Sequence, residues 1–259
     1  MKTLTVMQKE WKEIIRSKLL VFNMVLIPVI FVLMPLALTM ILGREDVLAS
    51  SLTNSEVSTL RRALESPEDV QIFLLHESLF MFLMIPIFLP LGMAIYGILN
   101  ERNERSLEPL LATPITVSEL MLGKSLSIIL PTMTVTWLTF AAFVVFLRYS
   151  VSPTVFHGVM RPMSLWALVL LPPALAQFTV SVGFIISSQV DDIRAASQIG
   201  GVIVLPVVGL TVMQLATRIV YSLTAFLAGI AGFLLLDLFL FWVMVHAFRR
   251  DSILTRSQA

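Results

Sequence analysis

Residues 101–114, which read ERNERSLEPLLATP, separate two long apolar runs and set the organisation of the chain around them. Seven of the first eight residues of this stretch are charged or polar. Leu107, Leu110 and Leu111 then place three apolar side chains on one face, because residues three and four apart are neighbours on a helix surface. The pattern predicts a short amphipathic helix between the two apolar runs.

Local signals mark the end of this helix and the start of the next one. Thr113 precedes Pro114, and the residue before a proline is biased away from the helical conformation. Thr116 and Glu119 then have the spacing of a capping box, which predicts that a new helix begins here. A short amphipathic helix held at a membrane face is well shaped to dock into a groove on a soluble partner.

The composition is that of an integral membrane protein. Hydrophobic residues make up 57% of the chain and charged residues only 14%, with a mean hydropathy of +0.91, far above an ordinary soluble domain. Cysteine is absent, which excludes disulfides and Cys-ligated metal sites. The net charge of +1, without a basic stripe, gives no electrostatic basis for binding nucleic acid.

Six apolar runs each approach the ~20 residues that a helix needs to cross ~30 Å of hydrocarbon. We therefore predict an all-α integral membrane protein, a single transmembrane domain over residues 1–259 embedded in the lipid bilayer. The six spans are expected near 20–42, 77–99, 125–147, 165–187, 197–215 and 223–247. The fifth contains three glycines and Pro206, a composition compatible with a broken or re-entrant helix.

Residues 3–19 predict an interfacial amphipathic helix before the first span. Its apolar face would carry Leu4, Met7, Trp11, Ile14 and Ile15, and its polar face Lys9, Glu10, Lys12, Glu13 and Arg16. A basic polar face opposite a tryptophan is typical of a helix lying in the headgroup region. A soluble extension of the first span is the alternative.

Most of the 18 Lys and Arg residues fall on the side of the termini and of residues 100–116. The positive-inside rule therefore predicts cytoplasmic N- and C-termini in a multi-pass protein of the cell (inner or plasma) membrane. The loop at 43–75 is then external, as a solvated cap or a substrate-binding element. Residues 187–194 form a second short cytoplasmic loop, which is either a second partner contact or a plain turn.

No motif for catalysis or nucleotide binding is found in the sequence. Gly123-Lys124-Ser125 resembles the end of a phosphate-binding loop, but Ser118 stands where that pattern needs a glycine, and no strand precedes it. We interpret Lys124 as an anchor at the cytoplasmic interface. Protease and hydrolase signatures are also missing, so we expect neither an enzyme nor a metal site.

Asp237 lies in the middle of the sixth predicted span, where an ionisable group costs roughly 2.5–3.5 kcal/mol and should face protein or water. In one interpretation it lies on the substrate path, together with Gln177 of the fourth span. In the other it is a protonated or hydrogen-bonded group that fixes helix packing against Gln177.

The region from 101 to 124 resembles the membrane subunit of type-2 ABC exporters, the permeases related to sodium-export and drug-export systems. The likeness rests on ER at 101–102, SLEPLLATP at 106–114, EL at 119–120 and GK at 123–124. Arg105 and Ser106 replace the glycine and threonine of the family's usual Gly-Thr-Leu-Glu. The layout is also similar: an N-terminal helix, two spans, this segment and four further spans.

The resemblance implies a permease that forms a homodimer, or a heterodimer with a second permease, and binds a separate ATPase subunit. ATP and magnesium would be held by that partner, and no cofactor by this chain. Residues 101–112 would be the family's coupling helix, and 3–19 its elbow helix. The implied ATPase contacts are Glu101, Arg102, Glu104, Arg105, Leu107, Glu108, Leu110, Leu111 and Thr113.

ATP-driven export is therefore the expected function. A secondary transporter or channel without an ATPase is the alternative, but it would need several intramembrane charges or an internal repeat, and Asp237 is nearly alone. A membrane-embedded enzyme is a third reading, for which the sequence offers no catalytic constellation.

Overall fold

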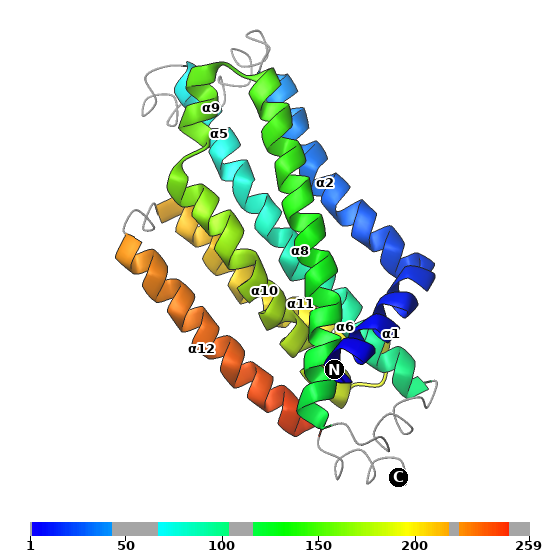
Figure 1. Ribbon diagram of the computed structural model, residues 1–259. Helices are drawn as coiled ribbons and strands as arrows, with labels where there is room; N and C mark the ends of the chain where they lie inside the picture. The colour runs from blue at the N-terminus through cyan, green and yellow to red at the C-terminus, as the bar shows by residue number, and fades with distance from the viewer. Residues whose placement is uncertain (1, 43–66, 104–115, 218–222, 249–259) are drawn as a thin grey trace.

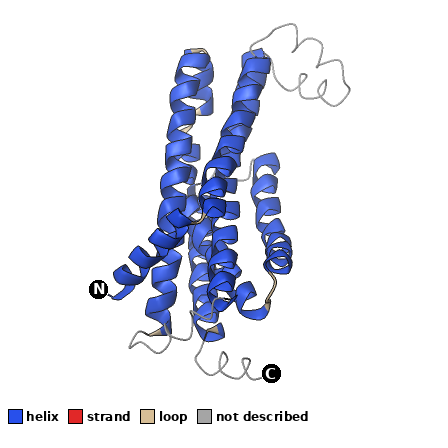
Figure 2. Cartoon of the chain, turned by 90° about the vertical axis from the view of Figure 1, so that its right-hand side faces the viewer, coloured by secondary structure: helices blue, strands red, loops and turns tan. Residues whose placement is uncertain are grey.

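The computed structural model describes residues 2–42, 67–103, 116–217 and 223–248, and every regular element in these ranges is a helix. Long helices lie side by side, and the short helix α1 (Lys2–Arg16) crosses the lower part of the bundle (Figure 1). The view turned by 90° shows the same elongated bundle (Figure 2). The prediction of an all-α fold is confirmed for the described part of the chain.

The helices of the described residues follow one another in chain order. After α1 come α2 (Lys18–Leu42), α5 (Pro67–Ser78), the 3-10 helix η1 (Leu79–Met84), α6 (Ile85–Asn103), α8 (Val117–Ser150), α9 (Pro153–Val159), α10 (Pro162–Gln189), α11 (Ile193–Thr217) and α12 (Leu223–Ala247).

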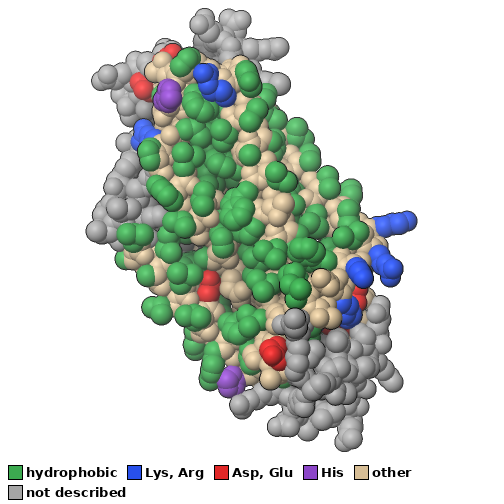
Figure 3. Space-filling model, viewed as in Figure 1, with side chains coloured by type: hydrophobic (Ala, Val, Ile, Leu, Met, Phe, Trp, Pro, Cys, Tyr) green, Lys and Arg blue, Asp and Glu red, His purple; other side chains and the backbone are tan. Residues whose placement is uncertain are grey.

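Within the described ranges, five helical stretches are long and apolar enough to cross a membrane: Leu20–Ala37, Gln71–Arg102, Val117–Ser150, Leu165–Gln189 and Leu227–Ala247. They overlap the first, second, third, fourth and sixth predicted spans. Hydrophobic side chains cover the middle of the face in Figure 3, whereas Lys and Arg side chains gather near its two ends. This distribution is the one expected of helices that cross a bilayer.

The fifth predicted span, 197–215, falls within α11, a helix of 25 residues. The apolar stretch identified in its described part is Ile193–Pro206, which is shorter than the other five. A sixth crossing therefore stays a prediction.

The loop predicted at 43–75 is wrong in its final part, because α5 begins at Pro67. Proline suits the first turn of a helix, where its missing N–H has no partner to lose, and Glu68 and Asp69 complement the positive end of the helix dipole. Leu75 is fully buried. The earlier part of the predicted loop, 43–66, lies outside the described residues.

The capping box predicted at the start of the third span is confirmed. The backbone N–H of Glu119 donates to Thr116 Oγ1 at 3.3 Å, and the N–H of Thr116 donates to Glu119 Oε2 at 2.9 Å. The helix that begins here, α8, has 34 residues and is about 51 Å long at 1.5 Å per residue. It therefore extends beyond a hydrocarbon layer of ~30 Å.

The core of the bundle lies between α6 and α10. Ile87, Ile95 and Ile98 of α6 are buried, and a side chain at Gly183 of α10 would come within 2.8 Å of Ala94 Cβ. This glycine lets the two central helices approach closely. By contrast, α2 and α12 expose large apolar side chains, as surfaces that face lipid do.

The two ends of the bundle differ. At one end, which we name the α1 end, lie α1, the last turn of α6 and the first turns of α8; α5 and α9 pack together at the other end (Figure 1). The α1 end is where the chain enters and leaves residues 104–115, which lie outside the described part.

Candidate functional site

Five charged side chains from three helices meet at the α1 end, and we name them the charge cluster: Lys9, Glu10 and Glu13 of α1, Glu101 of α6 and Lys124 of α8. Lys124 is at its centre. The Nζ atom lies 2.8 Å from Glu10 Oε1 and 2.7 Å from Glu101 Oε2, and only 2% of the lysine side chain is exposed. Glu101 is equally shielded, with 4% of its side chain exposed.

Lys9 connects this buried centre to the protein surface. Its Nζ atom lies 3.3 Å from Glu101 Oε1 and 3.1 Å from Glu13 Oε1, and about two fifths of its side chain is exposed. Glu101 is therefore held from two sides, by a buried lysine of α8 and a half-exposed lysine of α1. The cluster ties the end of α6 to both helices.

Burial and the neighbouring charges shift the pKa values of Glu10 and Lys9 on α1. The pKa of Glu10 is raised, chiefly because burial removes solvent from its carboxylate; repulsion by Glu101 adds to this, and attraction to Lys124 opposes it. For Lys9, burial alone would lower the pKa. The attraction of Glu101 together with that of Glu10 and Glu13 outweighs burial, so the pKa of Lys9 is raised.

The carboxylates of Glu10, Glu13 and Glu101 offer oxygens within 4.8 Å of one another. That spacing would suit a cation, but the ammonium groups of Lys9 and Lys124 already lie between these oxygens and balance much of their charge. We therefore assign no metal to the cluster and interpret it as a set of ion pairs that fixes helix positions.

The sequence places Glu10 on the inner face of α1 because Val6, Glu10 and Ile14 are spaced four residues apart and are all buried. The predicted polar face of this helix is thus wrong at Glu10, which is buried. Leu4, Trp11 and Ile15 of the predicted apolar face are exposed, as side chains that face lipid are. Pairing with Lys124 supplies the charge that makes burial of Glu10 tolerable.

Gly123 allows α1 to approach α8 closely. A Cβ atom at Gly123 would lie 3.0 Å from Val6 Cβ and 3.1 Å from the carbonyl oxygen of Thr3. Close contact at this point brings the next residue, Lys124, within reach of Glu10. Lys124 is therefore a buried partner in an ion-pair network rather than the interfacial anchor that we predicted.

Arg102, next to Glu101, connects α6 to a different part of the bundle. Its guanidinium forms an ion pair with Asp191 Oδ1 and donates to the carbonyl oxygens of Ser187 at 2.7 Å and Val190 at 3.3 Å. Ser187 lies in the last turn of α10, and Val190 and Asp191 lie in the turn between α10 and α11. The loop at 187–194 thus contacts α6 within the chain.

Glu101 and Arg102 therefore attach the end of α6, just before residues 104–115, to two different parts of the bundle. Glu101 is attached to α1 and α8, and Arg102 to the α10–α11 turn. Of the residues predicted to contact a partner, these two are described, and Glu101 is buried. The others lie outside the described residues: Glu104, Arg105, Leu107, Glu108, Leu110, Leu111 and Thr113.

Asp237 and Gln177, the predicted substrate-path pair, do not interact through a hydrogen bond between them in the structure. Gln177 Nε2 donates to Ser181 Oγ at 2.9 Å, within its own helix. Asp237 is 4% exposed on α12, and within the described residues neither of its carboxylate oxygens has a hydrogen-bond partner. The predicted packing contact through Gln177 is therefore not formed as a hydrogen bond.

Sequence reasoning missed that Lys9, Glu10 and Lys124 belong to the charge cluster and that Asp191 pairs with Arg102. For Glu10 a signal is present, because it occupies the same helical stripe as Val6 and Ile14. Lys124 and Asp191 carry no comparable local signal, since their partners are 23 to 114 residues away along the chain.

Comparison with known proteins gives one result that covers the chain. The family described as ABC-2 family transporter protein matches residues 4–256. No curated protein matches the chain significantly. The matched range includes all five residues of the charge cluster as well as Arg102 and Asp191.

Proposed function

The chain belongs to the ABC-2 family of transporter proteins, and from this membership and the geometry above we propose that it is the membrane-spanning permease subunit of an ATP-binding cassette exporter. In this proposal a separate ATPase subunit binds ATP and magnesium and docks on residues 101–112. Two permeases, identical or related, form the translocation path between them.

The family and the five apolar helices indicate a multi-pass membrane protein. We place the α1 end on the cytoplasmic side of the cell membrane, with both termini there, because of the excess of Lys and Arg on that side. This orientation brings the charge cluster and the flanks of residues 104–115 to the face where a cytoplasmic ATPase is available.

One observation carries the proposal: Glu101 and Arg102, the first two residues of the docking segment, are attached to different parts of the bundle. A displacement of residues 101–112 by the ATPase would act through Glu101 on α1 and α8, and through Arg102 on the α10–α11 turn. A single docking site can thus move helices on both sides of α6. Asp237 and Gln177 stay candidates for the substrate path.

The proposal is tested by changing the apolar face of the docking segment. We expect Leu107→Glu with Leu110→Glu to abolish co-purification of the ATPase from native membranes, since charged side chains cannot enter an apolar groove without a large desolvation cost. Membrane insertion should be unchanged. The matched control adds two negative charges at exposed positions at the other end of the bundle, Tyr149→Glu with Thr154→Glu, and should leave the ATPase bound.

An ATPase that still co-purifies with the Leu107 and Leu110 variant would contradict the docking assignment. A wild-type preparation that contains no ATPase and has no vanadate-sensitive ATP hydrolysis would contradict the exporter proposal itself. The secondary-transporter alternative would then be examined through Asp237→Asn, with ion-driven uptake as the measurement.

A further inference from the structure

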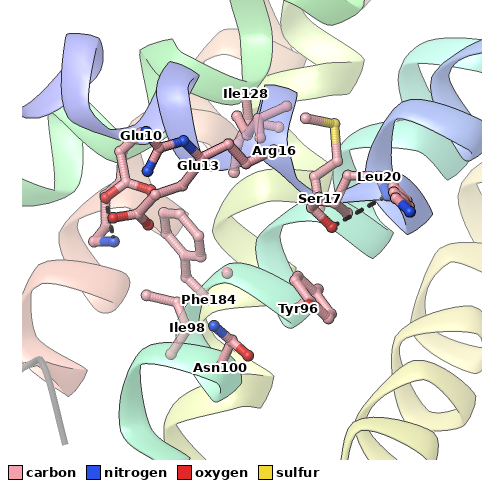
Figure 4. A pocket seen from close by; sticks show the side chains of 15 residues that line it. Glu10, Glu13, Arg16, Ser17, Leu20, Tyr96, Ile98, Asn100, Ile128 and Phe184 are labelled. Carbon is pink, nitrogen blue, oxygen red and sulfur yellow. Dashed lines mark hydrogen bonds and ion pairs between the residues drawn. The ribbon is translucent and has the colours of Figure 1, made fainter. Parts of the chain in front are cut away.

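A cavity of about 510 Å³ opens at the α1 end, beside the charge cluster. It is bounded by the corner between α1 and α2, by α6, by two residues of α8 and by one residue of α10. Figure 4 shows Glu10, Glu13 and Arg16 on one side of it, with Tyr96, Asn100 and Phe184 on the opposite side.

The lining of this cavity has two chemically different parts. Its inner wall is apolar and is formed by Leu20, Met93, Ile98, Ile128 and Phe184. All five belong to the buried core of the bundle, and Met93, Ile98 and Phe184 are the most deeply buried of them. An alkyl chain would be desolvated in contact with this wall.

The outer part of the cavity carries positive charge. Arg16 and Lys18 are exposed and line it, and neither forms an ion pair with another described residue. The acidic residues that line it, Glu10 and Glu13, are each paired with a lysine of the charge cluster. The two lysines of the cluster face three carboxylates, so the cluster keeps one negative charge. Arg16 and Lys18 therefore leave a net charge of +1 around the cavity.

The position of the cavity indicates where its ligand comes from. The α2 helix begins at Lys18, and its next turns expose Phe22 and Val25, so the surface beside the opening is the apolar face of a span. Basic residues at the end of an apolar span lie at the level of lipid headgroups. A lipid can thus reach the cavity laterally, with its phosphate next to Arg16 and Lys18.

We propose that this cavity binds an anionic phospholipid, whose phosphate is held by Arg16 and Lys18 while part of an acyl chain lies against Met93, Ile128 and Phe184. A guanidinium donates two parallel hydrogen bonds to phosphate oxygens, and a lysine adds a point charge. Because Arg16 belongs to α1 and Lys18 to α2, a lipid bound to both also holds the corner between these two helices in place.

Two independent changes remove the two parts of the site. Arg16→Gln with Lys18→Gln removes the charge. Gly97 lines the cavity, and a Cβ atom there would meet no atom within 4 Å, so Gly97→Phe fills the cavity without a clash at its Cβ. Gly92 of the same helix also has open space around its Cβ but does not line the cavity, and Gly92→Phe is the matched control.

The inference depends on the chain crossing a membrane and not on coupling to an ATPase, so the permease is tested alone. The protein is placed in nanodiscs that hold phosphatidylglycerol and phosphatidylcholine in equal amounts, and retained lipids are counted by native mass spectrometry. We expect the wild type to retain phosphatidylglycerol about tenfold more than phosphatidylcholine. The charge variant should retain both lipids equally, and Gly97→Phe should retain neither.

Two control variants should retain the two lipids as the wild type does. One is Gly92→Phe, and the other is Lys12→Gln with Arg194→Gln, which controls for lost positive charge. Equal retention of the two lipids by the wild type would overturn the headgroup assignment. Unchanged retention in Gly97→Phe would overturn the cavity assignment. Displacement of the lipid by millimolar glycerol phosphate would identify a soluble phosphorylated ligand instead of a lipid.

Discussion

Lys124 is the residue on which the charge cluster depends, because its ammonium group is buried between two carboxylates. Removing one partner of a buried ion pair leaves the other charge uncompensated, at a cost of about 3–5 kcal/mol. We expect Lys124→Met to lower the free energy of unfolding by about that amount, as measured by denaturant unfolding in detergent. Lys12→Met, an exposed lysine of α1, is the matched control.

The triple variant Lys124→Met, Glu10→Gln and Glu101→Gln distinguishes the effect of an unpaired buried charge from the effect of the altered lysine side chain. Replacing a whole buried ion network by neutral groups is often nearly neutral for stability, so this variant should recover most of the loss. A Lys124→Met protein as stable as the Lys12→Met control would show that the cluster contributes nothing to the fold.

Glu10 predicts a dependence of stability on pH. Burial raises its pKa above the ordinary 4.5, so the folded protein holds this proton more tightly than the unfolded chain does. Glu10 therefore favours folding most below pH 4.5, and its contribution falls as pH rises through its folded pKa. Across this window we expect the stability of the wild type to fall relative to that of Glu10→Gln.

The measurement for Glu10 is the unfolding midpoint at steps of pH from 4 upward, for the wild type and Glu10→Gln side by side. Glu68→Gln, an exposed carboxylate on α5 at the other end of the bundle, is the control. A constant difference between wild type and Glu10→Gln over the whole range would contradict the raised pKa.

At the scale of elements, the contact between α1 and α8 depends on Gly123, since a larger residue would meet Val6 at 3.0 Å. Forcing extra atoms into a well-packed contact costs about 1–3 kcal/mol or moves the helix. We expect Gly123→Leu to displace α1 and so to expose Val6. The chain has no cysteine, so Val6→Cys gives a single site whose labelling by a maleimide measures this exposure.

Val6→Cys alone should label slowly, because Val6 is 6% exposed. Adding Gly123→Leu should raise the labelling rate at least about tenfold, which corresponds to about 1.4 kcal/mol of lost docking. Gly232→Leu, at an open position of α12, should leave the rate unchanged. Equal rates in all three proteins would mean that α1 does not dock through Gly123.

At the scale of the whole molecule, Arg102 connects α6 to the α10–α11 turn through a pair in which 87% of the Asp191 side chain is exposed. Exposed pairs contribute about 0–1 kcal/mol to stability, so losing this one should change the fold little. In the proposed exporter this contact transmits movement of the docking segment, so we expect Arg102→Asp to lower stimulation of ATP hydrolysis by the permease about tenfold, measured per ATPase bound.

Charge reversal makes this test specific. Arg102→Asp with Asp191→Arg restores the ion pair but not the two hydrogen bonds to carbonyl oxygens, so it should recover part of the stimulation, whereas Arg102→Asp with the control change Asp192→Arg should recover none. Full stimulation in the single Arg102→Asp variant would contradict a role for this contact in coupling.

The sequence by itself determined the helical class, five of the predicted crossings and the family, because these depend on properties of contiguous residues. An apolar run near 20 residues long defines a span wherever it lies. The capping box at Thr116 and Glu119 is equally local, and the structure forms it as predicted. The ER, SLEPLLATP, EL and GK motifs are also short stretches, and the family match agrees with them.

Only the tertiary structure decided which charges meet. Glu10, Glu101 and Lys124 come from three helices, and no pattern within one helix says which charge of another helix its own charges will meet. The close approach at Gly123 decides it, since it brings α1 against α8 and sets Glu10 beside Lys124. Burying a charge requires a partner of opposite sign, and that partner is selected by the packing of helices distant in sequence.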